Sequence, residues 1–420
     1  MTGAHLGVET MAALTALRQQ TFSSLGNPNY RRYFTGQAIS MTGTWMQIVA
    51  QSWLVLQLSG SATALGVVTS IQTLPMLFLG PYSGLLADRF DKRKLLIATQ
   101  AVSAALAAGL GVLTLSGHAE LWHVMVFAAL LGLGNCLTNP ARSAFTSEMV
   151  GPDELRNAVS LNSVLVNCAR AVGPAIAGVV IAAGGTGVCF LSNAASFLAV
   201  IFSLATLDVS RLYRAPRTRR APGQVREGLA YVRRTPNLLV PLVMLAIVGC
   251  LAYEFQVVLP VVARDSFGNG AETYGFMTAA MGAGAVVGGL YVAARGKTGL
   301  PVLVRSATLF TIVLSAAAVA PTLWLELVAL FFVGAVSVGF LSQGVSTLQL
   351  GSDPSMRGRV VALWLVALQG TTPIGGPIAG VVTEYLGGRA GLVLAAAACA
   401  VAAVIGWLVV RSRDVPVSPS

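Results

Sequence analysis

Long apolar segments alternate with short polar connections along almost the whole chain. Each segment has about 20 residues, which is enough for a helix to cross a hydrocarbon core of about 30 Å. Twelve such segments can be drawn, and an even number leaves both chain ends on the same side of a membrane. We predict transmembrane helices over residues 33–58, 63–87, 95–116, 121–145, 157–182, 187–207, 238–262, 272–294, 302–320, 324–349, 360–384 and 389–410.

Positive charge follows the same alternation. Of the 27 Lys and Arg residues, all but Arg170, Arg264 and Arg389 lie at the chain ends or in every second connection. Basic connections near span ends are retained on the cytoplasmic side of a membrane, where they contact anionic lipid headgroups. The pattern predicts cytoplasmic termini, and it accounts for the net charge of +11 without nucleic acid as a partner.

Composition narrows the class of protein further. Charged residues make up 10% of the chain, against about 25% in soluble domains. The five cysteines and three histidines show no spacing typical of a metal site, so we expect no metal, cofactor or disulfide framework. No phosphate-binding loop of the Walker type is present, so an ion gradient, most simply of protons, must supply the energy for any transport.

The longest polar interruption divides the spans into two groups of six. It is rich in Arg and contains two prolines, which is typical of a cytoplasmic linker, and its second half, Val225–Arg234, is predicted to form a short surface helix. The predicted domains are a cytoplasmic N-terminal tail (1–28), an N-terminal six-helix lobe (29–207), a basic linker (208–237), a C-terminal six-helix lobe (238–411) and a cytoplasmic tail (412–420).

The two groups of spans also share a sequence repeat. The segment 152–161, followed by Gly173–Val180, is matched in the second half by 354–363, followed by Gly376–Val382. The nearly constant offset predicts two similar lobes. Parallel repeats with a substrate path between them define a large class of transporters. We therefore expect an all-α membrane protein with twelve transmembrane helices in two pseudo-symmetric six-helix bundles.

The connection after the second span carries a motif. It reads GLLADRFDKRK from Gly84 to Lys94, and it resembles the signature of the major facilitator superfamily, G-x-x-x-D-R/K-x-G-R-R/K. The matching positions are Gly84, Asp88, Arg89 and Arg93, whereas Asp91 replaces the usual Gly and Lys92 the usual Arg. This version, together with residues 27–40, resembles the branch of drug and siderophore exporters that includes the enterobactin exporter. The resemblance implies the major facilitator fold.

The same motif suggests a cytoplasmic gate. Asp88 at a helix end can pair with basic residues or with helix N-terminal amides and so hold the two lobes together. The alternative is that the motif is only a run of positive charge that sets topology.

The fifth span carries a second partial motif. Gly173, Pro174 and Gly178 resemble the antiporter-associated motif G-x-x-x-G-P-x-x-G-G of the superfamily, with Ala169 and Val179 in place of two glycines. The resemblance implies a role in export. The alternative is close packing and a local bend, which Gly and Pro permit in any membrane helix.

Two ionisable residues lie within predicted spans, Arg170 in the fifth and Glu254 in the seventh. A charge at the centre of a bilayer costs about 2.5–3.5 kcal/mol on insertion scales, so each should face a cavity or a partner. Arg170 either binds an anionic substrate group or fixes helix packing. Glu254 is the candidate proton-coupling residue, unless it is permanently paired with a basic neighbour; a contact between the two is a further possibility.

Polar residues in the first span fall on one helical face: Gln37, Ser40, Thr44, Gln47 and Gln51. Such a face points away from lipid and is predicted to line a hydrated path, with helix–helix hydrogen bonding as the alternative. Asn139, Asn167 and Gln256 are predicted to complete the lining.

Together these features predict a secondary transporter of the bacterial cytoplasmic membrane, not an enzyme, that acts as a monomer and contacts membrane lipids. We expect export of a small amphipathic substrate, a siderophore or an antibiotic, in exchange for protons. An importer of the same fold, an integral-membrane enzyme and a non-transporting sensor are the alternatives.

Overall fold

The computed structural model describes residues 22–213, 224–268, 270–295 and 298–414, with the side chains of 81–88, 224–226, 295 and 413–414 excluded. These residues form helices and connections, and no strand occurs among them. The first half of the described chain contains η1 (Ser23–Gly26), α2 (Pro28–Ser59), α3 (Ala62–Arg89), α4 (Lys92–Leu115), α5 (Leu121–Ala205) and η2 (Val209–Arg211).

The long helix α5 is not straight. Gly151 and Gly185 have φ angles of 74° and 80°, in the left-handed region that glycine adopts without steric cost. These two residues divide α5 into segments 121–150, 152–184 and 186–205. The segments are compatible with the fourth, fifth and sixth predicted spans, with the connections tightened to single glycines.

The second half contains α6 (Gln224–Arg234), α7 (Pro236–Leu251), α8 (Phe255–Val261), the π-helical turn η3 (Val262–Ser266), α9 (Ala271–Arg295), α10 (Leu300–Val319), α11 (Leu323–Leu350), α12 (Arg357–Gln369), α13 (Thr372–Leu386) and α14 (Gly388–Asp414). Helix α6 forms where the surface helix is predicted. Two predicted spans contain a break in the helix: span 238–262 at residues 252–254, and span 360–384 at Gly370 and Thr371. Each remains one long apolar stretch.

Over the described residues, nine helical stretches are long and apolar enough to cross a membrane. Helix α2 is not among them, because its polar residues lower its mean hydropathy. With α5 counted as three segments the stretches number eleven, and α2 would make a twelfth span, as predicted. Large apolar side chains are exposed on the outside, as lipid contact requires, for example Phe202, Val319 and Trp324.

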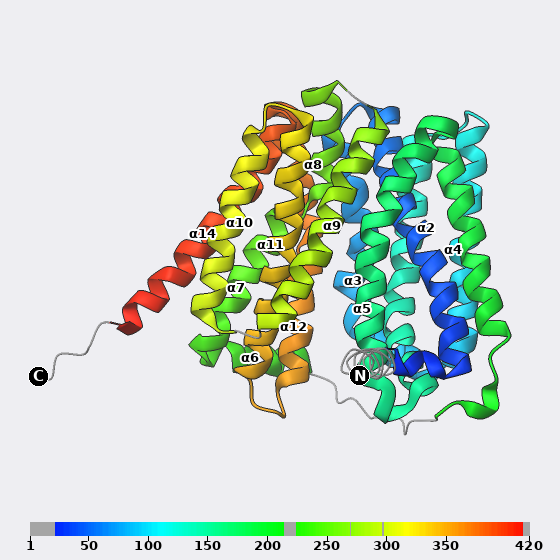
Figure 1. Cartoon of the computed structure of the whole chain (residues 1–420), viewed down its shortest axis with the longest axis horizontal. Helices are drawn as coiled ribbons and strands as arrows, with labels where there is room; N and C mark the ends of the chain where they lie inside the picture. The colour runs from blue at the N-terminus through cyan, green and yellow to red at the C-terminus, as the bar shows by residue number, and fades with distance from the viewer. Residues whose placement is uncertain (1–21, 214–223, 269, 296–297, 415–420) are drawn as a thin grey trace, which may run out of the picture.

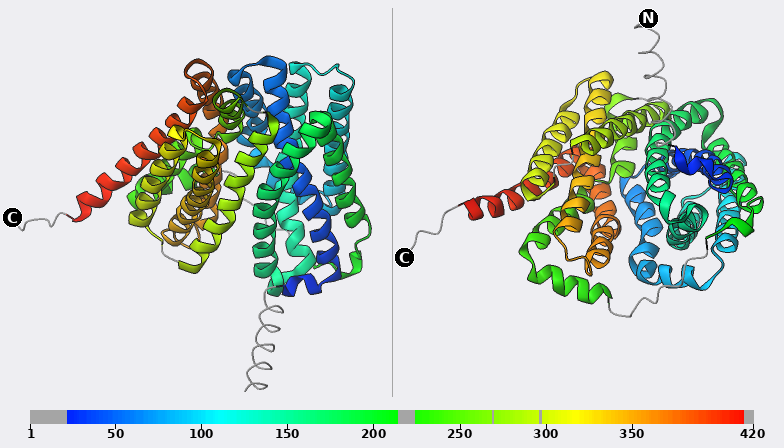
Figure 2. Two further views of the ribbon diagram at one scale, coloured as in Figure 1. Left: turned by 45° about the horizontal axis from the view of Figure 1, so that its top comes forward. Right: turned by 60° about the horizontal axis from the view of Figure 1, so that its bottom comes forward.

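The helices form two bundles that lie side by side (Figures 1 and 2). Helices α2–α5 make the first lobe and α7–α14 the second. We call the end that carries α6 and the start of α2 the linker end, at the bottom of Figure 1, and the opposite end, at the end of α2 and the start of α14, the far end. Helix α6 is fixed to the second lobe by the ion pair Arg359–Glu227, 2.6 Å, and by the hydrogen bond from Tyr231 to Asp353.

Candidate substrate path between the lobes

The lobes touch closely toward the far end, along α3–α13 and α5–α9. A Cβ atom added at Gly66 would lie 2.2 Å from the carbonyl oxygen of Gly376, and one at Gly275 would lie 2.6 Å from that of Pro174. Since real Cβ atoms do not come so near, only glycine permits these backbones to meet. Gly376 and Pro174 belong to the two copies of the sequence repeat, so the repeat marks the places where the lobes join.

The fifth-span motif takes part in this contact. Gly173 packs inside the first lobe, where an added Cβ would lie 2.6 Å from Cβ of Trp45, whereas Pro174 and Gly178 face α9 of the other lobe. This geometry is what the packing interpretation requires. It neither supports nor contradicts a role of this motif in export.

Toward the linker end, the same face of α5 is uncovered. Ala171 packs against Gly282 of α9. Farther along the same face, at successive spacings of four, three and four, Asn167 is half-buried, and Val164 and Ser160 are exposed. On α9, Leu290 is 65% exposed, two turns beyond Gly282. The lobes therefore diverge from the middle of the molecule toward the linker end.

The polar face of α2 is largely buried. Gln37, Ser40, Gln47 and Gln51 are each less than 9% exposed, and Thr44 is exposed with its hydroxyl bonded to the Ser40 carbonyl. The Gln47 side-chain oxygen accepts a hydrogen bond of 2.6 Å from the Asn193 amide. In this conformation, helix–helix hydrogen bonding thus occupies part of the face.

Gln51 lies where the two lobes meet. Its amide donates to the Gln72 side-chain oxygen at 2.9 Å, and both glutamines line a small space with Gln256 of α8. The space measures about 10 Å³, roughly enough for one water molecule. Gln51 and Gln256 were both predicted to line the path, whereas Gln72 and Asn193 were missed. Polar side chains within apolar spans were the signal that could have identified them.

Arg170 lies between the lobes. Its guanidinium carbon is 4.9 Å from the centroid of the Trp45 ring, a cation–π contact, and its Nε has no hydrogen-bond partner among the described residues. Tyr253 of the second lobe lies nearby, and its hydroxyl donates to the Ser337 carbonyl. Arg170 and Glu254 form no ion pair in the described part of the chain.

Glu254 lies at the break between α7 and α8. Its side chain is 4% exposed, and its Oε1 atom has no hydrogen-bond partner among the described residues. Gly375 of α13 leaves room for that oxygen, since an added Cβ would be 3.1 Å away, and Thr372 lies nearby. Glu254 takes part in none of the ion pairs among the described residues.

Two helix breaks therefore coincide in the second lobe. The thiol of Cys250, at the end of α7, lies 3.7 Å from the carbonyl oxygen of Thr371, at the start of α13. Interrupted helices expose backbone groups that a continuous helix would use internally, and transporters place ion sites at such breaks. Glu254 supplies a carboxylate at this point.

The remaining predicted lining residues lie elsewhere. Asn139 is exposed and Asn167 is half-buried. Each bonds within its own helix, Asn139 with Arg142 and Asn167 with the Ser163 carbonyl. Neither forms a described hydrogen bond with Gln51, Gln72 or Gln256.

The loop motif is only partly visible. Gly84 and Asp88 lie outside the residues whose side chains the structure describes, so their predicted gate contact stays a prediction. Arg89 is exposed. Arg93 donates to the carbonyls of Leu204 and Ala205, where a cation stabilises a helix C-terminus. Asp91, which replaces the usual Gly, caps the start of α4 by accepting from the Lys94 amide.

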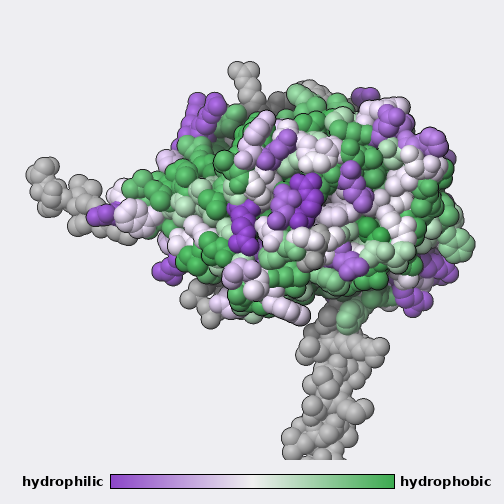
Figure 3. Space-filling view, turned by 90° about the horizontal axis from the view of Figure 1, so that it is seen from above, coloured by the Kyte–Doolittle hydropathy of each residue, from purple (hydrophilic) through white to green (hydrophobic). Residues whose placement is uncertain are grey.

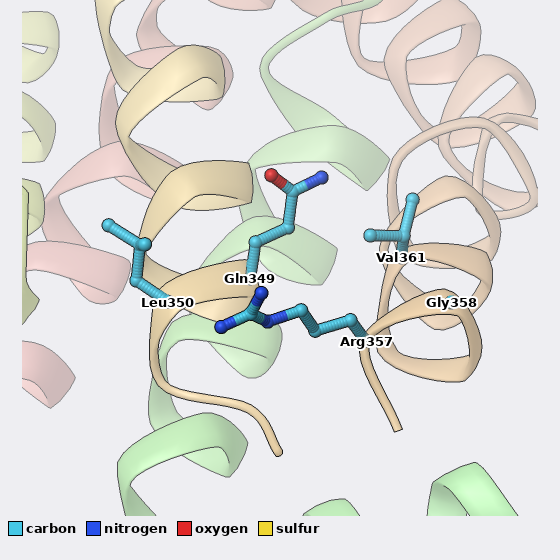
Figure 4. A pocket seen from close by; sticks show the side chains of 5 residues that line it. All are labelled: Gln349, Leu350, Arg357, Gly358 and Val361. Carbon is cyan, nitrogen blue, oxygen red and sulfur yellow. The ribbon is translucent and has the colours of Figure 1, made fainter. Parts of the chain in front are cut away.

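A shallow pocket of about 360 Å³ lies at the linker end of the second lobe (Figure 4). It is bounded by the end of α11 and the start of α12, and the Arg357 side chain extends toward Gln349. None of its lining residues lines the small space beside Gln51 and Gln256.

Residues 19–416 match the family described as "Transmembrane secretion effector". The chain belongs to the major facilitator superfamily. The predicted family and fold class are thus confirmed, and the family and fold are those of multi-pass membrane transporters, not of enzymes. The chain is similar to the staphyloferrin A transporter of Staphylococcus aureus, with 32% identity over 41% of the chain and 44% of that protein. It is also similar to macrolide efflux protein A of Streptococcus pyogenes, with 22% identity over 66% and 69%.

Solved structures share the fold. The bacterial homologue of the human lysosomal transporter Spinster, in an inward-facing and unoccupied conformation, superposes with a TM-score of 0.74 over 92% of this chain and 98% of that one, at 13% identity. The bacterial homologue of the iron transporter ferroportin gives 0.73 over 91% and 98%, at 14% identity.

Proposed function

We propose that this transporter exports small amphipathic molecules, siderophores or antibiotics, across the bacterial cytoplasmic membrane in exchange for protons. The similarity to a siderophore transporter and to a macrolide efflux protein supports the substrate class. The basic residues of the linker and of the loop motif support a cytoplasmic position for the linker end. In that orientation the lobes diverge toward the cytoplasm, the side from which an exporter takes its substrate.

The observation that carries the proposal is the pair of incompletely bonded ionisable side chains at the lobe interface. Arg170 from the first lobe and Glu254 from the second each retain a polar atom without a partner. A buried polar group without a partner costs free energy, and substrate or proton binding can compensate for that cost. Arg170, beside the Trp45 ring, would bind the anionic or aromatic part of a substrate. Glu254 would carry the proton.

Alternating access would then proceed by rocking of the lobes. The far-end contacts at Gly66 and Gly275 would open while the faces of α5 and α9 close at the linker end. Proton uptake by Glu254 from outside and substrate release would occur in the outward-open state, and the reverse exchange in the state described above. The functional unit in this scheme is a single chain.

The test is transport in inside-out membrane vesicles with an imposed proton gradient. We expect substrate accumulation in these vesicles for the unaltered protein. For Glu254→Gln we expect gradient-driven accumulation to fall at least about tenfold, while substrate exchange without a gradient stays within about threefold, because Gln cannot release a proton. Unchanged gradient dependence in Glu254→Gln would remove this residue from coupling.

The direction of transport has its own control. An importer of the same fold that carries protons with its substrate would accumulate substrate in right-side-out vesicles under an inward proton gradient, and would not accumulate it in inside-out vesicles with an acidic lumen. That result would reverse the proposed direction and leave the coupling residue in place.

A further inference from the structure

The hydrogen bonds that join the two lobes are concentrated at the far end. Among the described hydrogen bonds, those that cross between α2–α3 and α7–α14 connect residues 60–63 with Arg264 and Glu384. Figure 3 shows this end of the molecule, with hydrophilic residues gathered near the middle of the face. The contacts are therefore local to one edge of the lobe interface.

Glu384 makes two of these bonds with a single oxygen. Its Oε2 accepts from the Ser61 hydroxyl at 2.5 Å and from the Thr63 backbone N–H at 2.8 Å. Ser61 is the N-cap residue of α3, and its hydroxyl oxygen also accepts from the Ala64 N–H. The first turn of a helix leaves N–H groups without internal partners, and a carboxylate is favoured there by the helix dipole. Glu384 of the second lobe thus completes the cap of a first-lobe helix.

Arg264 adds a second crossing contact. Its Nη1 donates to the carbonyl oxygen of Gly60 at 3.3 Å, while its Nε pairs with Asp265 at 2.6 Å. Gly60 is the C-cap of α2, where carbonyl oxygens lack partners and a cation is favoured. The turn between α2 and α3 is consequently held at both helix ends by side chains of opposite charge from the other lobe.

These contacts depend on the closed far end. An added Cβ at Gly380, one turn from Glu384, would lie 2.7 Å from the Ala62 carbonyl oxygen, so the backbones already touch there. A movement of a few ångströms that separates α13 from α3 exceeds the range of a hydrogen bond.

We infer that Glu384 and Arg264 form a far-end latch that stabilises this conformation of the transporter and that must break before the far end opens. The latch goes beyond the proposed function, because it concerns the balance of two conformations and not the substrate or the coupling ion. In this latch, side chains of the second lobe cap helices of the first lobe: the Glu384 anion caps the start of α3, and the Arg264 cation caps the end of α2.

The test measures the distance between the lobes at the far end in detergent or nanodiscs without substrate. Spin labels are placed at His118→Cys in the first lobe and Thr322→Cys in the second, both exposed, with the exposed Cys168 replaced by Ser. We expect Glu384→Ala to raise the ratio of the long-distance to the short-distance population by about threefold to tenfold, the usual effect of losing an exposed charged hydrogen bond.

Glu272→Ala is the matched control. Glu272 is an exposed carboxylate near the far end, beside Gly178, and no hydrogen bond of its side chain is described. Removing it changes net charge equally and should leave the ratio unchanged. An equal shift in both variants, or no shift in Glu384→Ala, overturns the latch.

A double-mutant cycle separates the loss of the Ser61–Glu384 bond from a general effect of each substitution on folding. If the bond is direct, Ser61→Ala and Glu384→Ala together should shift the ratio less than the product of the single shifts. Fully multiplicative shifts contradict the latch. Because the measurement uses neither substrate nor a proton gradient, its result is independent of whether the proposed export and coupling are right.

Discussion

The two ends of the molecule are stabilised in different ways. At the far end, close glycine contacts and hydrogen bonds connect the lobes, as at Gly66–Gly376 and Ser61–Glu384. At the linker end, the described ion pairs stay on one side of the interface: Lys92–Glu148 lies in the first lobe, and Arg359–Glu227 joins α6 to the second. The far end therefore resists separation of the lobes, whereas at the linker end the ion pairs stabilise each lobe by itself.

The largest expected effect comes from filling the glycine contact at the far end. In Gly66→Ala the new methyl group would meet the Gly376 carbonyl oxygen at 2.2 Å, so the backbones must separate. Overpacking costs about 1–3 kcal/mol, which corresponds to a shift of roughly fivefold to a hundredfold toward the far-end-open state. Spin-label distances between His118→Cys and Thr322→Cys measure it.

Gly134→Ala provides the control for that substitution. Gly134 is also a helical glycine of the first lobe, but the nearest atom to an added Cβ is 3.9 Å away. This variant should keep the original distance distribution. If both alanine variants behave alike, steric contact at Gly66 does not hold the far end closed.

A smaller effect is expected for Arg170, at the middle of the interface. Its variants separate a role in substrate binding from a role in helix packing. If Arg170 binds an anionic substrate group, Arg170→Gln should raise the KM for transport at least about tenfold, and Arg170→Lys less, because Lys keeps the charge but loses the flat contact with Trp45. Thermal unfolding of each variant is measured in parallel. A fall in Tm with unchanged KM in both variants would assign Arg170 to packing alone.

The difference between the ends was only partly predictable from sequence. The alternation of apolar and basic segments predicted the helical fold, and the repeats at Gly173 and Gly376 mark the contact surfaces between the lobes. The latch could not be predicted, because Glu384 lies more than 300 positions from Ser61 and its exposed carboxylate gives no signal in hydropathy.

The helix breaks were missed for a related reason. Residues 252–254 separate α7 from α8 within one long apolar stretch, and the break contains no glycine. Hydropathy registers only that the segment is apolar. Glu254 was therefore predicted as a residue within the seventh span, whereas the structure places it at a helix start, beside the second break at Thr371. Contacts between distant segments determine that geometry.

The smallest effect is expected at the linker end. Lys92 and Glu148 belong to the same lobe and their side chains are 20% and 17% exposed. Glu148→Gln should lower the free energy of unfolding by about 1 kcal/mol or less, as partly exposed ion pairs do, and should leave the far-end distance distribution unchanged, because the pair moves with its lobe in both conformations. Chemical denaturation and the spin-label distances check the two statements separately. A population shift like that of Glu384→Ala would mean that this pair contacts the other lobe in the alternative conformation. The difference between the two ends of the molecule would then hold for one conformation only.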